Sequence, residues 1–355
     1  MNKFVFGALA VTTASTLGFA NNGEDWMTLD REIESLASGM AQGGSGFTVD
    51  GWIKSSYASS SDVTIAGNDL GGFSLDSIRA NLDGSLGDFN VHVALEGSND
   101  PGFGYFGSVG NASSVGVIDA YSTFNITEQV GVQVGFFRPP FLNDSLRDEN
   151  EFLFIDRTVQ GDVWAFRDQG ALFSFMFDQF SAWLGAQNGF DAQGDDLVLT
   201  GRVEFNAMGQ GQASTEGAYG SADENNLNLG AAYYDDDNVT DGSAISVDAD
   251  FSRGPLYAAA SLVDYDDGLA ALISPLAGET PWDITVSYMF APDEWEIAAR
   301  WEDLDDSQDS TMLSLGVNYY VEGHDMKWQL NYSTIDSDNS SNEVDVLAVA
   351  MLVSV

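Results

Sequence analysis

The chain has 355 residues, enough for one large β domain or two smaller domains, and 55 acidic against 12 basic residues give a net charge of −43. That charge argues against duplex nucleic acid as a partner, because binding it requires a basic surface. The absence of cysteine excludes disulfides, thiolate metal sites and cysteine nucleophiles.

The first twenty residues have the features of a secretory signal. Lys3 provides the positive region, residues 4–17 are apolar, and residues 18–20 read Gly-Phe-Ala, a small-residue cleavage site. After residue 20 no stretch reaches the ~18 consecutive apolar residues that a membrane-spanning helix requires. The sequence therefore predicts an exported protein (signal peptide 1–20) that can enter a membrane only as strands.

Residues 25–38 are expected to form a short helix, because Leu29, Ile33 and Leu36 recur at helical spacing in an acidic segment. A Gly/Ser run then separates this helix from the first strand. We interpret residues 21–45 as a periplasmic helical segment with a linker. An oligomerising coil is the alternative, although the segment is too short to establish a heptad repeat.

From residue 46 to 355, short stretches alternate apolar and polar residues. Residues 78–86 place Ile, Ala, Leu, Gly and Leu on one face and Arg, Asn, Asp and Ser on the other. After a tight turn, residues 89–96 repeat the pattern. A period of two indicates a strand with two different environments. A long series of such hairpins fits a barrel in lipid with a wet interior.

The alternation predicts about sixteen strands, an even number as in bacterial outer-membrane barrels. They centre on residues 47–57, 74–86, 89–96, 115–126, 129–137, 169–177, 179–187, 196–206, 226–235, 244–252, 255–264, 281–290, 294–302, 311–321, 325–334 and 343–355. Short turns alternate with mostly longer loops, as expected for a barrel with short periplasmic turns. The connection 207–225 is long where a short turn is due, so either a strand is miscounted or a periplasmic insertion exists.

Aromatic residues lie near the ends of the apolar faces. Trp282 opens one such face, Tyr288 and Phe290 close it, and Trp295 and Trp301 hold the same positions in the next stretch. Amphipathic rings favour headgroup depth, so this placement indicates girdles at both membrane interfaces. We therefore predict an all-β fold, a transmembrane antiparallel β-barrel of about 16 strands.

The loop 137–168, the third of the long set, carries the most distinctive motifs. They are Gly-Phe-Phe-Arg-Pro-Pro-Phe at 135–141, Phe-Ile-Asp-Arg at 154–157 and Arg-Asp-Gln-Gly at 167–170. Over residues 130–175, and more loosely over the whole barrel, the chain resembles the phosphate-selective porin O and P family. The resemblance implies a sixteen-stranded, usually trimeric porin whose third long loop folds inward and narrows the pore.

A long loop without predicted secondary structure is expected to have a function. Its four arginines stand among seven acidic residues, and opposed charges across a narrow lumen order water and set ion preference. We predict that the pore constriction contains Arg138, Arg147, Asp148, Glu149, Arg157 and Arg167. The alternative is that the arginines only tie the loop to carboxylates on the barrel wall. We favour tethering for Arg157 and Arg167, whereas solute contact stays open for Arg138 and Arg147.

Further charged residues fall on the polar registers of the strands and are expected to face the lumen. They are Lys54, Arg79, Asp83, Arg202, Glu204, Arg300 and Lys327. Acidic neighbours accompany most of the basic ones, such as Asp83 by Arg79, Glu204 by Arg202, and Glu296 and Glu302 by Arg300. Anion-selective members of the resembled family line their path with Arg and Lys, but acids outnumber them here, and a negative lumen repels phosphate.

The sequence thus predicts passive diffusion of small hydrophilic solutes or ions through a barrel narrowed by the loop 137–168. A family-typical anion- or phosphate-selective channel and a secreted or surface β-rich adhesion protein are the alternatives. An enzyme is not expected, because the chain has only two histidines and its abundant carboxylates single out no catalytic pair.

No cofactor is predicted. The acidic loops at 235–237, 264–267 and 302–306 are candidates for loosely bound divalent cations, which prefer carboxylate oxygens. The expected partners are outer-membrane lipid and lipopolysaccharide, small hydrophilic solutes or ions, and further copies of the chain in a homotrimer. The expected location is the bacterial outer membrane.

Overall fold

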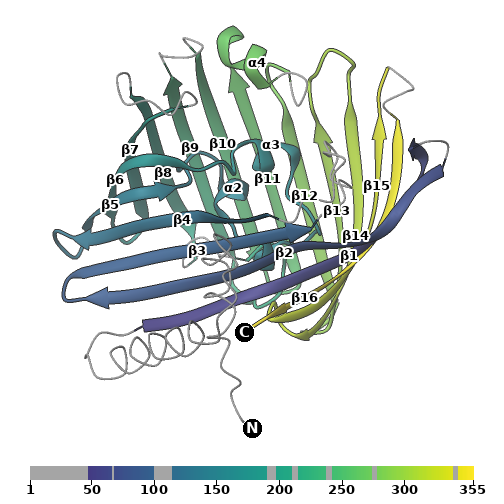
Figure 1. Cartoon of the computed structure of the whole chain (residues 1–355), viewed down its shortest axis with the longest axis horizontal. Coiled ribbons are helices and arrows are strands. Elements are labelled where there is room, and N and C mark those ends of the chain that lie inside the picture. The colour runs from purple at the N-terminus through teal and green to yellow at the C-terminus, as the bar shows by residue number, and fades with distance from the viewer. Residues whose placement is uncertain are drawn as a thin grey trace, which may run out of the picture.

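The computed structural model describes residues 47–65, 68–99, 114–189, 197–209, 215–236, 242–273, 278–338 and 343–355. Within them, sixteen antiparallel strands form one closed barrel in which β1 pairs with β16 (Figure 1). This confirms the predicted all-β barrel. The signal peptide, the helix at 25–38 and its linker lie outside the described residues.

Each strand pairs with its neighbours in chain order. The strands are β1 (Phe47–Ile65), β2 (Asn68–Leu86), β3 (Phe89–Asn99), β4 (Ser114–Asn125), β5 (Val130–Phe137), β6 (Asp168–Met176), β7 (Phe180–Gln187), β8 (Val198–Met208), β9 (Asn226–Asp236), β10 (Gly242–Arg253), β11 (Leu256–Tyr265), β12 (Trp282–Ala291), β13 (Trp295–Asp303), β14 (Thr311–Glu322), β15 (Met326–Asp336) and β16 (Val344–Ser354). The helices are α2 (Asn143–Leu146), η1 (Glu149–Glu151), α3 (Val159–Val163) and α4 (Asp267–Ile273). Within the described residues, none of the helices is both long enough and apolar enough to cross a membrane.

The first hairpin is longer than the alternation predicted. β1 continues to Ile65 and β2 begins at Asn68, although residues 58–73 were expected to be mostly loop. Pairs such as Ser59 with Gly71 show the ladder continuing through small and polar residues. Backbone hydrogen bonds hold the ladder, so it can extend beyond the apolar side chains that reveal a strand in the sequence.

Along most of the wall, polar side chains face the inside of the barrel and apolar side chains face the outside. In β12, Asp283 and Thr285 are buried, whereas the intervening Ile284 and the following Val286 are exposed. The predicted girdle residues Trp282, Tyr288, Phe290, Trp295 and Trp301 are all exposed in the same register. An apolar outer wall around a polar interior is the arrangement that lipid surroundings require.

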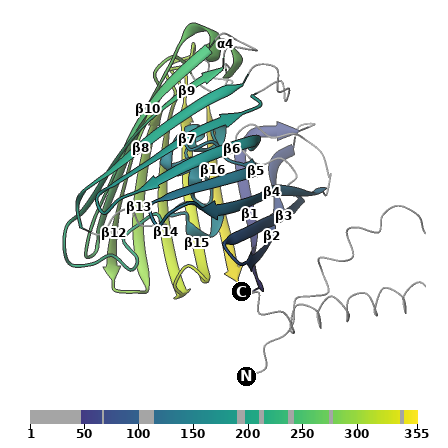
Figure 2. The ribbon, with the colours of Figure 1, turned by 90° about the vertical axis from the view of Figure 1, so that its left-hand side faces the viewer.

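The two ends of the barrel differ. Short turns, such as residues 87–88 between β2 and β3, lie at one end, and α4 lies at the other (Figure 2). We call these the turn end and the loop end. β8 and β9 are both present and paired, so no strand was miscounted and the connection 207–225 is an insertion at the turn end.

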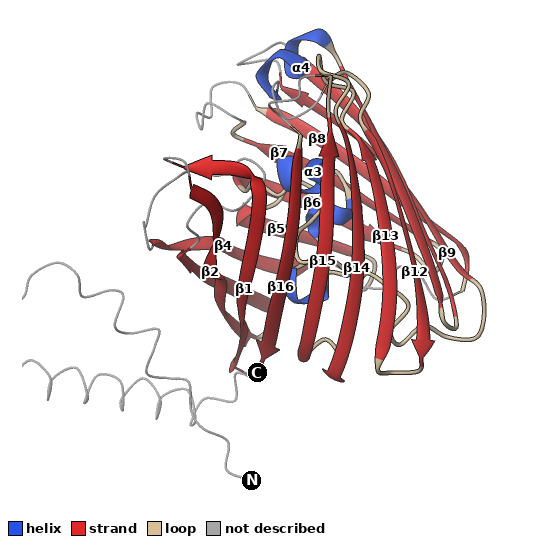
Figure 3. Ribbon diagram, turned by 90° about the vertical axis from the view of Figure 1, so that its right-hand side faces the viewer, coloured by secondary structure: helices blue, strands red, loops and turns tan. Residues whose placement is uncertain are grey.

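Two connections fold into the barrel. Residues 138–167, here called the inner loop, join β5 to β6 and carry α2, η1 and α3 inside the ring of strands (Figures 1 and 3). Residues 215–225, here called the inner strut, precede β9 and enter from the turn end, where they contact the inner loop. Together these segments place the buried apolar clusters inside the barrel, between themselves and the wall.

Candidate functional site

The sequence around residue 138 forces the chain to leave the barrel wall. Pro139 and Pro140 have no backbone N–H to donate to a ladder, so β5 ends at Phe137. Gly135 has φ of 144°, and a Cβ there would lie 2.2 Å from the carbonyl oxygen of Ala120. Only glycine fits this close approach of β5 to β4. The loop therefore departs inward from a fixed point on the wall.

An aromatic cluster holds the first part of the inner loop against the wall. The rings of Phe141 and Trp164 stack with centroids 3.7 Å apart. They pack with Tyr234 and Tyr265 of β9 and β11, and Trp164 Nε1 donates to Tyr265 Oη at 2.7 Å. Each buried aromatic side chain of this kind contributes on the order of 2 kcal/mol through removal from water. This cluster supplies the apolar part of the docking.

Buried ion pairs continue the attachment along β8 and β10. Arg202 donates to both carboxylate oxygens of Asp248, at 2.7 and 2.8 Å, and to the carbonyl oxygen of Phe141 at 2.9 Å. Arg147 Nη2 lies 2.9 Å from Asp250 Oδ1. Burial alone would lower the pKa of Arg147, but the Asp250 carboxylate raises it well above its usual value. The Arg147 guanidinium therefore stays charged, and both guanidinium groups bind the loop to the wall.

The tip of the inner loop reaches the opposite wall, where cations of the strands bind its carbonyl groups. Lys54 Nζ donates to the carbonyl of Ile155 at 2.9 Å and lies 3.1 Å from Glu149 Oε2. Lys327 Nζ donates to the carbonyl of Phe152 at 2.5 Å. Burial raises the pKa of Glu149, but Lys54 and the other cation nearby, Arg157, lower it to about 2. The tip is thus held by β1 and β15 at once.

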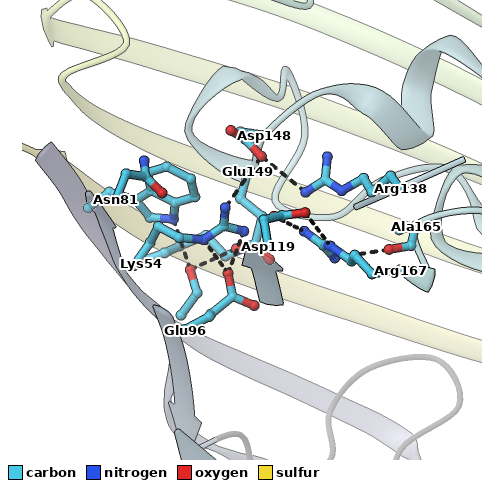
Figure 4. A network of polar contacts seen from close by, with 12 residues as sticks. Lys54, Asn81, Glu96, Asp119, Arg138, Asp148, Glu149, Ala165 and Arg167 are labelled. Atoms are coloured by element: carbon cyan, nitrogen blue, oxygen red, sulfur yellow. Dashed lines mark hydrogen bonds and ion pairs between the residues drawn. The ribbon is translucent and has the colours of Figure 1, made fainter. Parts of the chain in front are cut away.

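A second group of charges lies between the inner loop and strands β2–β4 (Figure 4). Arg79 pairs with Glu96 at 2.7 Å and lies 3.6 Å from Asp148. Arg138 lies 3.0 Å from the same Asp148 oxygen and donates to the carbonyls of residues 145–147. We call this group, which also contains an Arg167–Asp119 pair at 3.3 Å, the charged ring.

Two acids of the charged ring are more exposed than two of its arginines, whereas Arg167 and Asp119 are similarly covered. The side chains of Arg79 and Arg138 are 2% and 7% exposed, whereas those of Asp148 and Glu96 are 39% and 23% exposed. Burial and the neighbouring Arg157 and Arg167 lower the pKa of Arg138 to about 10, which leaves it protonated at neutral pH. The ring therefore presents carboxylate oxygens to the open space and covers these two guanidinium groups.

A cavity of about 490 Å³ lies on the inner faces of β1–β5 toward the turn end. Its lining includes Asp83, His92, Tyr121, Thr123 and Gln133. His92 Nδ1 lies 2.8 Å from Asp83 Oδ1, and its ring stacks on that of Tyr121. Most of the lining residues have polar side chains, and one of them is the half-exposed carboxylate of Asp83, so hydrated solutes can wet this surface.

The charged residues expected on polar registers all lie on the inner face, but most are covered. The inner loop covers Lys54, Arg202, Arg300 and Lys327, whereas Asp83 is exposed at the cavity and Glu204 pairs with Arg202. Among the constriction candidates, Arg138, Asp148 and Arg167 belong to the charged ring. Arg147 and Glu149 bind the wall, and Arg157 donates to the carbonyl of residue 147.

Two arginines form ion pairs with acids other than their same-face neighbours along the strand. Arg79 pairs with Glu96, which lies across the register, and Arg300 pairs with Glu216 of the inner strut. Residues four apart on a strand are separated by roughly 13 Å, whereas residues opposite each other on paired strands are about 5 Å apart. Arg79 faces Glu96 in the register of β2 and β3. Sequence reasoning also missed Asp119 and Asp250, which pair with arginines of the inner loop, and Asp248, which pairs with Arg202 across β9.

The acidic loop at 264–267 has a structural role. Asp266 accepts hydrogen bonds from the backbone of Leu269 at 3.0 Å and of Ser243 at 2.6 Å, so it caps α4 and joins two strands. Over the part of the chain that the structure describes, no group of three or more His, Asp or Glu side chains is placed to hold a metal ion.

Residues 35–340 match a family model described as Gram-negative porin. The high-pH structure of Pseudomonas putida OprB has a TM-score of 0.58 at 13% identity, over 91% of this chain and 97% of that chain. A double mutant of the Rh. blastica porin gives 0.56 at 13% identity, over 87% and 100%. The trimer form of Vibrio cholerae OmpT, folded in vitro, gives 0.57 at 11% identity, over 88% and 100%. A comparison with curated proteins gave no match.

Proposed function

This chain belongs to the Gram-negative porin family, and from that premise we propose that its pore favours cations and neutral hydrophilic solutes over anions. As a member of the family it is an outer-membrane channel for passive diffusion, and it is not an enzyme. The turn end then faces the periplasm, as in other bacterial barrels.

The exposure of the charged ring carries this proposal. A permeating ion meets the half-exposed carboxylate of Asp148 and the partly exposed carboxylate of Glu96, while Arg79 and Arg138 are held against the walls. Exposed acidic side chains in a narrow path attract cations and repel anions. Farther toward the periplasm, the exposed Asp83 carboxylate at the cavity adds charge of the same sign.

The proposed path runs along β1–β5. The inner loop and inner strut bury the inner faces of β8–β15, where Arg202, Glu296 and Lys327 are inaccessible. The cavity of about 490 Å³ lies on the other side, next to the charged ring. Arg138, Asp148 and Arg167 then border the constriction, while Arg147, Glu149 and Arg157 hold the loop in place.

A phosphate- or anion-selective channel, as in the porin O and P family, is the competing function. The four arginines of the inner loop favour it, but Arg147 and Arg138 already bind carboxylate or carbonyl oxygens. A bound guanidinium offers few free donors to a passing anion.

The reversal potential of single channels in a planar bilayer under a KCl gradient tests the proposal. We expect the sign of a cation-preferring pore at ~0.1 M salt and a weaker preference at ~1 M, because salt screens exposed charges over a shorter distance. Anion preference would support the competing function instead. Absence of channels from folded protein would contradict the diffusion function itself.

We propose further that three chains assemble in outer-membrane lipid with lipopolysaccharide around the trimer. The exposed apolar outer faces of the strands support burial in lipid, and the trimer form of Vibrio cholerae OmpT has the same fold. The mass of the detergent-solubilised protein checks the trimer. A monomeric mass together with unchanged conductance would refute it.

A further inference from the structure

The inner strut makes the connection between β8 and β9 longer than their hairpin requires. β8 and β9 remain paired as far as Met208 and Leu227, so a turn of a few residues could close the hairpin. The other connections described at the turn end are short, as between β2 and β3 or β10 and β11. Residues 215–225 of this connection lie inside the barrel, and their contacts indicate what they do there.

Glu216 is the centre of these contacts. The residue is 3% exposed, and its carboxylate accepts from the backbone N–H of Leu153 at 2.9 Å and lies 3.3 Å from Arg300 Nη2. Its own backbone N–H donates to the carbonyl of Glu151 at 2.9 Å. The strut therefore accepts one hydrogen bond from the tip of the inner loop and donates another to it. Through Arg300 it also connects the tip to β13.

The next three residues of the strut pack closely against the loop tip and the wall. Gly217 has φ of 104°, and a Cβ there would lie 3.0 Å from both Leu153 and Glu296, so the turn requires glycine. Ala218 donates to Glu296 at 2.6 Å and packs in the buried cluster with Leu153 and Phe154. The ring of Tyr219 lies 4.7 Å from that of Tyr320 in β14.

The loop tip is thus held by the inner strut as well as by the wall. Lys54 of β1 binds the carbonyl of Ile155, Lys327 of β15 binds that of Phe152, and Glu216 binds the same segment from the periplasmic side. Asp148, the exposed acid of the charged ring, comes directly before the η1 turn that ends at Glu151, the residue bound by the strut. Displacing the strut would remove one hold on the segment that carries Asp148 and leave its ion pairs with Lys54 and Arg138 in place.

We propose that the inner strut is a positioning element of the pore, in which Glu216 fixes the tip of the inner loop and so sets the width of the path. This inference rests on the proposed diffusion function. Failure of the two can be told apart: wild-type protein without channels would contradict the function, whereas a conducting protein indifferent to Glu216 would contradict the positioning role alone.

Planar-bilayer recordings with neutral polyethylene glycols of graded size test it. Glu216→Ala removes both carboxylate contacts, and we expect a higher, noisier conductance and entry of larger polymers. Glu216→Gln keeps an acceptor for Leu153, so its effects should be intermediate. Glu224→Ala is the matched control, because Glu224 is an exposed acid of the same strut. Wild-type conductance and polymer exclusion in Glu216→Ala, or an equal shift in the control, would overturn the proposal.

Thiol labelling gives a second test that does not depend on conductance. The chain has no cysteine, so Leu153→Cys places a single thiol at a buried position of the loop tip. With folded barrels selected by their gel mobility before boiling, a membrane-impermeant maleimide should react on the order of 100-fold faster when Glu216→Ala is added, since a buried pair has lost one partner. If that variant gives no folded barrel, Glu216→Gln takes its place in the comparison. Equal rates would overturn the proposal.

Discussion

Replacing Asp148 by asparagine should weaken cation preference without altering the fold. Asp148 Oδ1 lies 3.0 Å from Arg138 and 3.6 Å from Arg79, and the side chain is 39% exposed. Asparagine has the same shape and keeps an acceptor for the arginines. The substitution removes one negative charge from the charged ring and leaves two guanidinium groups less compensated.

The size of the effect follows from the exposure. A unit charge about 4 Å from a permeating ion contributes about 1 kcal/mol in water. The two arginines and the solvent screen Asp148, so we assign roughly 0.5–1 kcal/mol to its interaction with a permeating ion. This corresponds to a roughly two- to fivefold fall in the ratio of cation to anion permeability.

Reversal potentials in KCl gradients measure this ratio. Asp178→Asn is the matched control, since it makes the same change at an exposed short turn between β6 and β7. Wild-type selectivity in the control and a reduced cation preference in Asp148→Asn are expected. An unchanged or stronger cation preference in Asp148→Asn would refute the assignment of the exposed carboxylate to the path.

Three further predictions concern the inner loop and the wall that carries it. Trp164→Ala should weaken the docking of the inner loop by about 3–5 kcal/mol, because it removes a buried aromatic ring and its hydrogen bond to Tyr265. Faster limited proteolysis within 138–167 would show this loss. Trp282→Ala, which removes an exposed ring from the outer face, is the control. Lowering the pH should loosen the loop between about 4.5, the ordinary pKa of a glutamate, and about 2, the lowered pKa of Glu149. A carboxyl group whose pKa is lowered in the folded state stabilises that state above its unfolded pKa, and it loses this contribution as the pH falls through the folded pKa. We therefore expect the current noise of single channels to rise over this pH range. The rise should be weaker in Glu149→Gln. Gly135→Ala should lower the free energy of unfolding by roughly 1–3 kcal/mol or more, since its Cβ would meet the Ala120 carbonyl. The temperature at which the barrel loses its folded gel mobility should drop in this variant. It should not drop in the control Gly116→Ala, where an added Cβ would have no atom within 4 Å.

The barrel itself was readable from the sequence. Alternation of Ile78, Ala80 and Leu82 with charged or polar neighbours depends only on the two faces of one strand, which a period of two reveals locally. The same alternation placed Lys54 and Arg202 on the inner face. The alternation predicted a strand shorter than β1, because the backbone pairing at its end continues without apolar side chains.

The partners of these charges depended on contacts that no local pattern contains. Glu96 meets Arg79 across a strand register, and Asp250 meets Arg147 across 103 positions of the chain. The long connection 207–225 was visible as an anomaly, but its inward path depends on the burial of Glu216 against Leu153 and Arg300. Periodicity therefore determined which face each residue takes. Only the tertiary structure decided which charges are covered and which remain exposed inside the barrel, because closure of the barrel and docking of two distant segments bring those groups together.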